Sequence, residues 1–333
     1  MAVLVTGAAG FIGYHISRAL LERGEQVVGI DNLSSYYDVG LKTSRMTELS
    51  QLGGQAFRFS ACDIADNVAL TARLTSEKFD RIVHLAAQAG VRYSLKDPGA
   101  YAAANLIGHL NLLEWARQRE VSHLIYASSS SVYGANTVLP FRVEDRTDRP
   151  ISLYAATKRA DELMSESYSH LFRLSLTGLR FFTVYGPWGR PDMAMWTFTD
   201  AISEGRPVYL FNEGRMRRDF TYIDDVIAGV LACLDRPPVD DGLEKAGGSR
   251  SPHALYNIGN SRSEELMRVV ELIEQQLGRK AIIHLQPMQP GDVPDTYADI
   301  SATRRDHGFE PRTSLDEGVP RFVEWYRSFH GLA

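Results

Sequence analysis

Short apolar runs alternate with longer amphipathic segments through the first half of the chain. The apolar runs predict strands at residues 2–6, 26–31, 55–60, 81–86, 122–128 and 177–184. Segments of helical periodicity separate them, most clearly at about 101–119 and 153–172. Strands that alternate with helices in this way are typical of βαβ units, whose strands form a parallel sheet with helices on both faces. We therefore predict a doubly wound α/β domain over residues 1–186.

The pattern changes beyond Pro187, where the predicted elements become shorter and less regular. The sequence predicts strands at 207–211, 255–258 and 281–286, and helices at 194–204, 223–235, 263–277 and 315–329. Pro237 to His253 is rich in Pro, Gly, Asp and Ser, which indicates an exposed loop. We expect residues 187–333 to form mainly a smaller substrate domain, with segments at about 219–260 returning to the first domain.

The composition is that of an ordinary globular protein. The 333 residues can bury a substantial core, with 44% hydrophobic and 23% charged residues. The net charge of -5, without a basic block, disfavours nucleic acid and anionic membranes as partners. Cys62 and Cys233 lie far apart without metal-ligand spacing, so we expect buried thiols and no metal site. No apolar run approaches a membrane span, and the first strand starts at once, which predicts a cytoplasmic protein without a signal peptide.

A glycine-rich turn follows the first predicted strand. It reads Gly7-Ala-Ala-Gly10-Phe-Ile-Gly13 and leads into an amphipathic helix that extends to about Arg23. Glycines permit a tight turn and a close approach of the backbone to a pyrophosphate, which the helix N-terminus faces with free N–H groups. Asp31, at the end of the next strand, is placed to accept hydrogen bonds from a ribose, and a carboxylate there disfavours the additional phosphate of NADP. This order of elements predicts a Rossmann-type NAD site.

Further residues at the ends of the predicted strands can complete that site. Asp63 follows the third strand, where it can reach an adenine edge or cap the next helix. Leu85-Ala-Ala-Gln88 ends the fourth strand with small residues, against which a dinucleotide can lie. The polar stretches Tyr36–Lys42 and Gly90–Pro98 predict irregular loops at the same edge of the sheet.

Tyr154 and Lys158 lie four residues apart in a predicted helix, so their side chains share one face. A free tyrosine ionises near pH ~10, too high for acid–base work at neutral pH, and a neighbouring ammonium group favours the phenolate. Ser129, delivered from the end of the preceding strand, can complete a proton relay to a sugar hydroxyl. The Y-x-x-x-K spacing alone is common on helices. Beside an NAD site, it predicts removal of a proton while a hydride leaves the same carbon.

Seven stretches, spread along nearly the whole chain, resemble the extended short-chain dehydrogenase/reductase family of nucleotide-sugar enzymes. They are DNLSSYYDVGLK (31–42), AAQAGVRYSLKDP (86–98), YASSSSVYG (126–134), SLYAATK (152–158), TGLRFFTVYGPWGRPDMA (177–194), RRDFTYIDDV (217–226) and QPGDVPDTYAD (289–299). The resemblance implies a Rossmann-type fold, bound NAD and a UDP-sugar substrate. Within this family the chain is most similar to the UDP-glucuronate 4-epimerases, which interconvert UDP-glucuronate and UDP-galacturonate by transient oxidation and re-reduction at C4.

The resemblance also implies roles for individual residues. Tyr154 matches the catalytic base, Lys158 its electrostatic partner and a ligand of the nicotinamide ribose, and Ser129 the proton-relay position. The NAD site would be formed by Gly7, Gly10, Phe11, Ile12, Gly13, Asp31, Asn32, Asp63, Ile64, Leu85, Ala86, Ala87, Gln88, Asn105, Ser128, Tyr154 and Lys158. The UDP-sugar would be bound by Arg92, Ser129, Ser130, Ser131, Thr183, Arg190, Arg218 and Asp292, of which Arg218 and Asp292 would hold the pyrophosphate and ribose.

Three positions separate the chemistries within the family. Its 4,6-dehydratases have two acids after the relay residue, and its UDP-glucuronate decarboxylases have a glutamate at the second position, whereas this chain has Ser130 and Ser131. UDP-glucose epimerases usually have asparagine in place of Thr183. The 4-keto form of a glucuronate is a β-keto acid, so a 4-epimerase must prevent loss of CO2. Hydroxyl donors together with Arg190, or with Arg92 as the alternative, would hold the carboxylate.

The sequence leaves several alternatives open. The enzymatic ones are a UDP-glucose 4-epimerase, a UDP-glucuronate decarboxylase and an oxidoreductase that releases its reduced cofactor, and the non-enzymatic one is an inactive NAD-binding regulatory protein. For Arg190, an ion pair within the small domain is as good an interpretation as binding of the substrate. For Ser130, capping of the backbone at the sheet edge has similar weight. The helices at 101–119 and 153–172 mix apolar and polar residues on several faces, which predicts a homodimer, with ordinary surface helices as the alternative.

Overall fold

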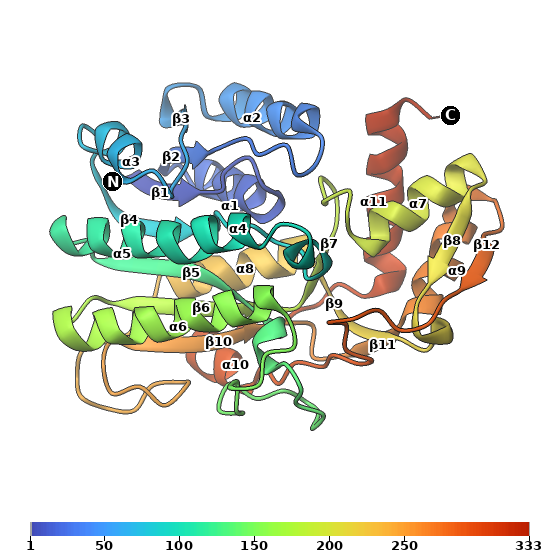
Figure 1. The fold of residues 1–333 in the computed structure, drawn as a ribbon. Helices are drawn as coiled ribbons and strands as arrows, with labels where there is room; N and C mark the ends of the chain where they lie inside the picture. The colour runs from blue at the N-terminus through green and yellow to red at the C-terminus, as the bar shows by residue number, and fades with distance from the viewer. Residues whose placement is uncertain (1, 333) are drawn as a thin grey trace.

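The computed structural model describes residues 2–332 and contains a seven-stranded parallel sheet (Figure 1). Its strands are β1 (Ala2–Thr6), β2 (Gln26–Asp31), β3 (Phe57–Ala61), β4 (Phe79–His84), β5 (His123–Ser129), β6 (Leu176–Phe181) and β10 (His253–Ile258). They lie in the order β10-β6-β5-β4-β1-β2-β3, so the winding direction changes between β1 and β4. In open α/β sheets, ligands bind at such a switch point, outside the carboxyl ends of the strands. The predicted doubly wound α/β fold is confirmed.

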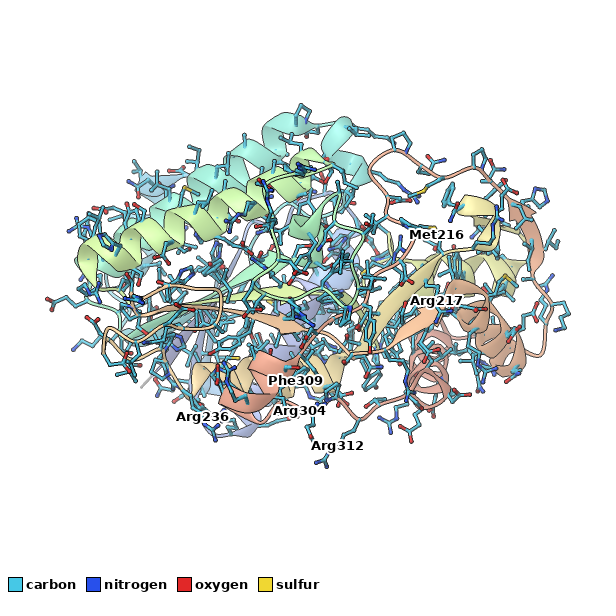
Figure 2. The ribbon with its side chains drawn as sticks, turned by 90° about the horizontal axis from the view of Figure 1, so that it is seen from below. Met216, Arg217, Arg236, Arg304, Phe309 and Arg312 are labelled. Atoms are coloured by element: carbon cyan, nitrogen blue, oxygen red, sulfur yellow. The ribbon has the colours of Figure 1, made fainter. Side chains whose placement is uncertain are left out.

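Helices cover both faces of this sheet. On one face α1 (Phe11–Glu22) packs against α2 (Val39–Gly53) and α8 (Ile223–Leu234), and α8 packs against α10 (Ser301–His307). On the other face lie α3 (Asn67–Leu74), α5 (Gly108–Gln118) and α6 (Leu153–Phe172), with α5 and α6 side by side in Figure 1. Figure 2 shows Phe309 on the side of the sheet opposite α6, where a Cβ on Gly229 would lie 2.9 Å from its ring. The absence of a side chain at Gly229 therefore lets the Phe309 ring pack closely against α8.

The second half of the chain adds a smaller unit beside the large sheet (Figure 1). It contains the parallel pair β8 (Pro207–Leu210) and β12 (Ile282–Leu285), with the helices α7 (Ala194–Glu204), α9 (Leu266–Leu277) and α11 (Leu315–His330). A three-stranded sheet of β7 (Thr183–Tyr185), β9 (Arg217–Tyr222) and β11 (Ser263–Glu265) lies between this unit and the large sheet, and Figure 2 labels Met216 and Arg217 at the start of β9. β10 and α8, although they lie beyond Pro187, pack with the large sheet.

Two predicted elements have different bounds in the structure because of tertiary contacts. The expected strand at 177–184 is two strands, β6 and β7, which belong to different sheets. The N–H of Phe182, between them, donates to Ile258 O at 3.0 Å, after which the chain leaves the large sheet. The expected helix at 263–277 begins only at Leu266, because residues 263–265 pair antiparallel with β9 as β11.

Several further predictions differ from the structure in their local detail. Part of the expected loop Tyr36–Lys42 is helical, because Asp38 caps α2 by accepting a hydrogen bond from Gly40 N at 2.8 Å. The expected helix at 101–119 consists of a short α4 (Pro98–Tyr101), a π-helical turn over Ala102–Ile107 and then α5. The expected loop Gly90–Pro98 is not wholly irregular, because Arg92–Leu95 form a 3-10 turn. β4 ends at His84, which leaves Leu85–Gln88 beyond the strand, at the sheet edge.

A buried ion pair joins α6 to the sheet. Arg180, in β6, donates from Nε and Nη2 to Glu162 Oε1 and Oε2 at 2.8 and 3.0 Å, and both residues are 1% exposed. Ser128 Oγ donates to the same carboxylate at 2.6 Å. Burial opposes ionisation of Glu162, but Arg180 and the Ser128 hydroxyl hold the pKa of its carboxyl below the ordinary value. The pair therefore fixes α6 against the carboxyl ends of β5 and β6.

Replacing Arg180 with methionine should lower the free energy of unfolding by about 3–5 kcal/mol, because the Glu162 carboxylate then stays buried without its main partner. Arg159→Met is the matched control. Arg159 donates to the same carboxylate at 2.8 Å, but its side chain is 31% exposed, so its loss should cost about 1 kcal/mol or less. Urea unfolding of both variants at saturating NAD measures the two effects. Similar small effects in the two variants would contradict the role given to the buried pair.

Candidate active site

The glycine turn between β1 and α1 forms part of a cleft at the carboxyl edge of the large sheet. Gly7 has a φ of 70°, and a Cβ on it would lie 2.7 Å from the backbone N of Ala86. A Cβ on Gly13 would lie 2.0 Å from Gly7 O. The N-cap of α1 is Gly10, which has no side chain to occupy the N–H groups of the first turn. The turn thus offers bare backbone donors at a helix N-terminus, which fits the pyrophosphate of a dinucleotide.

Asp31, at the end of β2, lines the same cleft. Its Oδ2 accepts a hydrogen bond from Ala9 N at 3.2 Å and its Oδ1 accepts one from Leu33 N at 2.7 Å, so both oxygens keep lone pairs for ribose hydroxyls. Burial raises the pKa of this carboxyl, against the opposing effects of Lys42 and of the two backbone donors. Its position matches the role that the sequence predicts for the adenosine ribose.

Most of the predicted NAD residues line this one cleft. They are Gly7, Gly10, Phe11, Ile12, Gly13, Asp31, Asn32, Asp63, Ile64, Leu85, Ala86, Ala87, Gln88, Ser128, Tyr154 and Lys158. Asn105 instead supports the wall, since its Oδ1 accepts from Gln88 N at 2.8 Å and its Nδ2 donates to Gln88 O at 3.1 Å. The alternative that Asp63 caps the next helix is wrong, because Asp66 is the N-cap of α3. Asp63 accepts a hydrogen bond from Asn32 Nδ2 at 3.0 Å instead.

The three predicted catalytic residues, Ser129, Tyr154 and Lys158, also line the cleft. Ser129 is the last residue of β5, and its Oγ accepts a hydrogen bond from Ser131 N at 3.2 Å. α6 begins directly after Ser152, its N-cap, whose Oγ accepts a hydrogen bond from Ala155 N at 3.1 Å. This cap places Tyr154 in the first turn of α6 and Lys158 in the second. A phenol, a hydroxyl and an ammonium group therefore line the same cleft as the glycine turn.

Arg190 faces the cleft and also forms the ion pair that the alternative interpretation expected. It donates from Nε and Nη2 to Asp192 Oδ1 and Oδ2 at 3.0 and 2.6 Å. Tyr36 OH donates to the same carboxylate at 3.0 Å. Thr183 lines a neighbouring hollow that shares Arg190 and Met193 with the cleft. The guanidinium is thus within the site and already held by an acid of its own chain.

The other predicted substrate residues lie outside the residues that line this cleft. Ser130 and Ser131 form the 3-10 turn that directly follows Ser129. Arg92 donates to Asp292 Oδ2 at 2.7 Å, and its guanidinium lies 4.2 Å from the centre of the Phe211 ring. Arg218 donates to the carbonyl oxygens of Arg217 and Pro294 at 2.8 and 3.3 Å. Burial lowers the pKa of Arg218, although Asp292 and Asp295 nearby raise it.

Three polar residues of the site escaped prediction. Lys42 is buried beside Asp31 and donates a hydrogen bond to Ser34 O at 2.7 Å. The motif D-x-x-L-K at 38–42, which starts a capped helix, could have indicated its position in the sequence. Asp192 holds Arg190, two residues before it in the chain. Asp161 accepts a hydrogen bond from Lys158, and the spacing of three residues on a helix was the signal for that pair.

Residues 2–332 contain neither a candidate metal cluster nor a candidate membrane span. No group of three or more His, Cys, Asp or Glu side chains there could hold a metal ion. No helix in the part of the chain that the structure describes is long and apolar enough to cross a membrane.

The chain is similar to enzymes that act on nucleotide sugars. A probable UDP-glucuronate 4-epimerase from Rhizobium meliloti is 48% identical over 98% of this chain and 97% of its own length. The crystal structure of UDP-glucuronic acid 4-epimerase from Bacillus cereus, in complex with UDP-glucuronic acid and NAD, matches with a TM-score of 0.88 and 33% identity, covering 99% of this chain and 100% of that one. The UDP-glucose 4-epimerase of Thermotoga maritima, solved with UDP-glucose, matches with a TM-score of 0.84 and 29% identity, covering 99% of this chain and 100% of that one. Residues 3–259 match the NAD dependent epimerase/dehydratase family, and the chain belongs to that family.

Proposed function

We propose that this protein is an NAD-dependent 4-epimerase that interconverts UDP-glucuronate and UDP-galacturonate. The observation that carries the proposal is a single cleft that unites the glycine turn, Asp31 and the group of Ser129, Tyr154 and Lys158. The high identity to a probable UDP-glucuronate 4-epimerase, over nearly the full length of both chains, supports the same substrate class. The relative that binds UDP-glucuronic acid and NAD has the same fold throughout.

The residues present fit NAD rather than NADP. The glycine turn leaves room for the pyrophosphate, and Asp31 offers two acceptor oxygens to the ribose while its charge disfavours a phosphate there. Lys42 lies beside that carboxylate but donates to Ser34 O, within its own loop. Bound NAD supplies the hydride acceptor and the hydride donor for carbon C4 of the sugar.

The side chains of the chain handle the proton. Tyr154, as phenolate, takes the proton of the C4 hydroxyl directly or through Ser129, which sits at the end of β5 on the same cleft. Lys158 stabilises the phenolate and binds the nicotinamide ribose. The 4-keto sugar then turns while the UDP stays bound. Tyr154 returns the proton when hydride is delivered to the opposite face, which inverts C4.

The nucleotide must stay fixed during that turn, and Arg218 is suited to hold its diphosphate. Among residues 2–332, Arg218 has no ion-pair partner, and its guanidinium donates only to backbone carbonyl oxygens. A cation without a carboxylate partner binds a diphosphate without first giving up an ion pair. Asp292 lies near Arg218 and is a candidate for the uridine ribose, while Arg92 is held by Asp292 and by the Phe211 ring.

The serines after Ser129 favour epimerisation over the other family chemistries. Related enzymes that remove water have acids at both of these positions, and those that remove CO2 have a glutamate at the second, whereas this chain has Ser130 and Ser131. Short hydroxyls can donate to a carboxylate and hold it without acting as an acid. We propose that they and Thr183 orient the substrate carboxylate so that its bond to C5 is not aligned with the C4 ketone. A UDP-glucose 4-epimerase is the second candidate, favoured by the structural similarity to such an enzyme.

We also propose that the protein is a homodimer paired through α5 and α6. The outer surface of these helices, and of the turn before α5, carries exposed apolar side chains, namely Ile107, Leu110, Leu163, Leu171 and Phe172. Large exposed apolar side chains on paired helices are typical of a protein–protein interface.

The cofactor should remain bound through turnover, because the hydride leaves and returns within one catalytic cycle. Purified protein should contain NAD, detected by its absorbance after denaturation, and should act without added cofactor. Absorbance at 340 nm in the filtrate should not rise when UDP-glucuronate is added. Stoichiometric reduced cofactor in the filtrate would instead identify an oxidoreductase.

Tyr154→Phe should reduce turnover by about 10²–10⁴, because it removes the general base while the ring stays in place. The variant should keep its NAD and its fold, as measured by cofactor content and circular dichroism. Tyr101→Phe is the matched control, since that ring packs edge-on against Tyr154 at 6.0 Å but its hydroxyl donates to backbone oxygens. Near-normal turnover by Tyr154→Phe would show that another group is the base.

UDP-glucuronate should be used roughly 5-fold to 150-fold more efficiently than UDP-glucose, since the acid sugar alone gains a charge-assisted contact with Arg190, worth about 1–3 kcal/mol. Arg190→Ala should narrow this ratio. Asp192→Asn should increase the ratio, because the substrate carboxylate then no longer has to displace the Asp192 carboxylate from Arg190. Carbohydrate NMR of both reactions measures rates and products. UDP-pentose as the main product, or equal efficiency on UDP-glucose, would refute the assignment.

A further inference from the structure

A buried ion pair lies directly behind the proposed base. Lys158 and Asp161 are one turn apart on α6, with Nζ 3.0 Å from Oδ2, and their side chains are 4% and 1% exposed. Tyr154, Lys158 and Asp161 follow an i, i+4, i+7 spacing, so they lie on one face of the helix. Lys158 lines the cleft, whereas Asp161 lies behind it. The acid therefore contacts the lysine from the side away from the ligand.

Asp161 is the counter-ion of Lys158. In the described part of the chain, Lys158 forms no other ion pair. The neighbouring acid, Glu162, is already paired with Arg180 and Arg159. A buried ammonium without a counter-ion is costly, so the pair offsets a large part of the cost of burying Lys158.

The other titratable groups that face this pair are uncharged at neutral pH. His84, from β4, and His109, from α5, lie close to Lys158, and burial lowers the pKa of both, to about 3 for His109. Tyr126, from β5, lies near Asp161, and burial raises the pKa of its phenol. The electrostatic balance around Lys158 therefore depends on Asp161.

Packing alone does not account for an acid at this position. Asp161 Oδ2 has Lys158 as its partner, but Asp161 Oδ1 is buried and has no hydrogen-bond partner among residues 2–332. Burial raises the pKa of this carboxyl to about 6, even though Lys158 lowers it. The unpartnered Oδ1 adds a desolvation cost that the ion pair with Lys158 does not remove. The position calls for a role in the site.

We propose that Asp161 is a positioning residue that acts on Tyr154 through Lys158. An ammonium group has three donors. Asp161 Oδ2 takes one and Ala127 O takes another, both at 3.0 Å, which leaves the third for the nicotinamide ribose. The negative charge of Asp161 also offsets part of the field with which Lys158 favours the Tyr154 phenolate. This inference rests on the proposed roles of Tyr154 and Lys158 and assigns a residue behind them.

The test measures ionisation of Tyr154 in the NAD-bound protein and needs no sugar substrate. Phenolate absorbance near 295 nm is titrated for the wild type and Asp161→Asn, and the curve of each matching Tyr154→Phe protein is subtracted. The amide keeps the shape and an acceptor oxygen but removes the charge. The Tyr154 midpoint should therefore move to lower pH by about 0.5–1 unit in Asp161→Asn. Asp161→Ala should shift it in the same direction and should also release NAD faster, because the acceptor for Nζ is lost.

Glu166→Gln is the matched control, since it removes a carboxylate from the same helix that bonds His253 and Ser249 instead of Lys158. It should leave the midpoint unchanged. An unchanged or raised midpoint in the Asp161 variants, an equal shift in Glu166→Gln, or loss of the fold in both Asp161 variants would overturn the proposal. Failure to convert UDP-glucuronate would refute the substrate assignment and leave this measurement valid.

Discussion

The geometry of the site depends on one buried ion pair, Arg180 with Glu162. Apolar contacts between a helix and a sheet tolerate small rotations and shifts, whereas a bidentate arginine–carboxylate pair has one favourable geometry. Glu162 lies four residues after Lys158 and eight after Tyr154, so the same pair sets the rotation of α6 for all three. Ser128, which also binds Glu162, is the residue before Ser129. One carboxylate thus aligns the helix that carries the proposed base with the strand that carries the proposed relay hydroxyl.

The same guanidinium links the site to the second half of the chain. Arg180 donates to Tyr133 OH at 3.1 Å, and Tyr133 OH donates to Asn257, in β10, at 2.6 Å. The Asn257 amide donates to Phe141 O and Asp299 O, both at 2.9 Å. These buried bonds tie the loop after β5 and the segment before α10 to the large sheet. The C-terminal segment that carries the predicted UDP-binding acid is therefore anchored to the network beneath the base.

Sequence patterns predicted the parts of the molecule that local signals determine. The glycine turn and its flanking elements were predicted at the residues where they lie, and α6 matches its predicted range because Ser152 caps its start and Arg173 turns left-handed after its end. The division of β6 from β7 could not be predicted, because the backbone bond from Phe182 to Ile258 joins positions distant in sequence. β11 became a strand through its pairing with β9, for the same reason. Partners such as Asp161 appear only when helix faces are placed in the fold.

Two of the cations that line the cleft are already paired with acids of the same chain. Lys158 is paired with Asp161 and Arg190 with Asp192, so the charge of each cation is balanced before a ligand binds. Arg218, for which we propose the diphosphate as ligand, has no such partner among the described residues. In the proposed mechanism the diphosphate pairs with an arginine that has no acid to release, whereas the sugar carboxylate must displace Asp192 from Arg190. Strong hold on the nucleotide and weak hold on the sugar are what a 4-keto intermediate needs in order to turn before it is reduced.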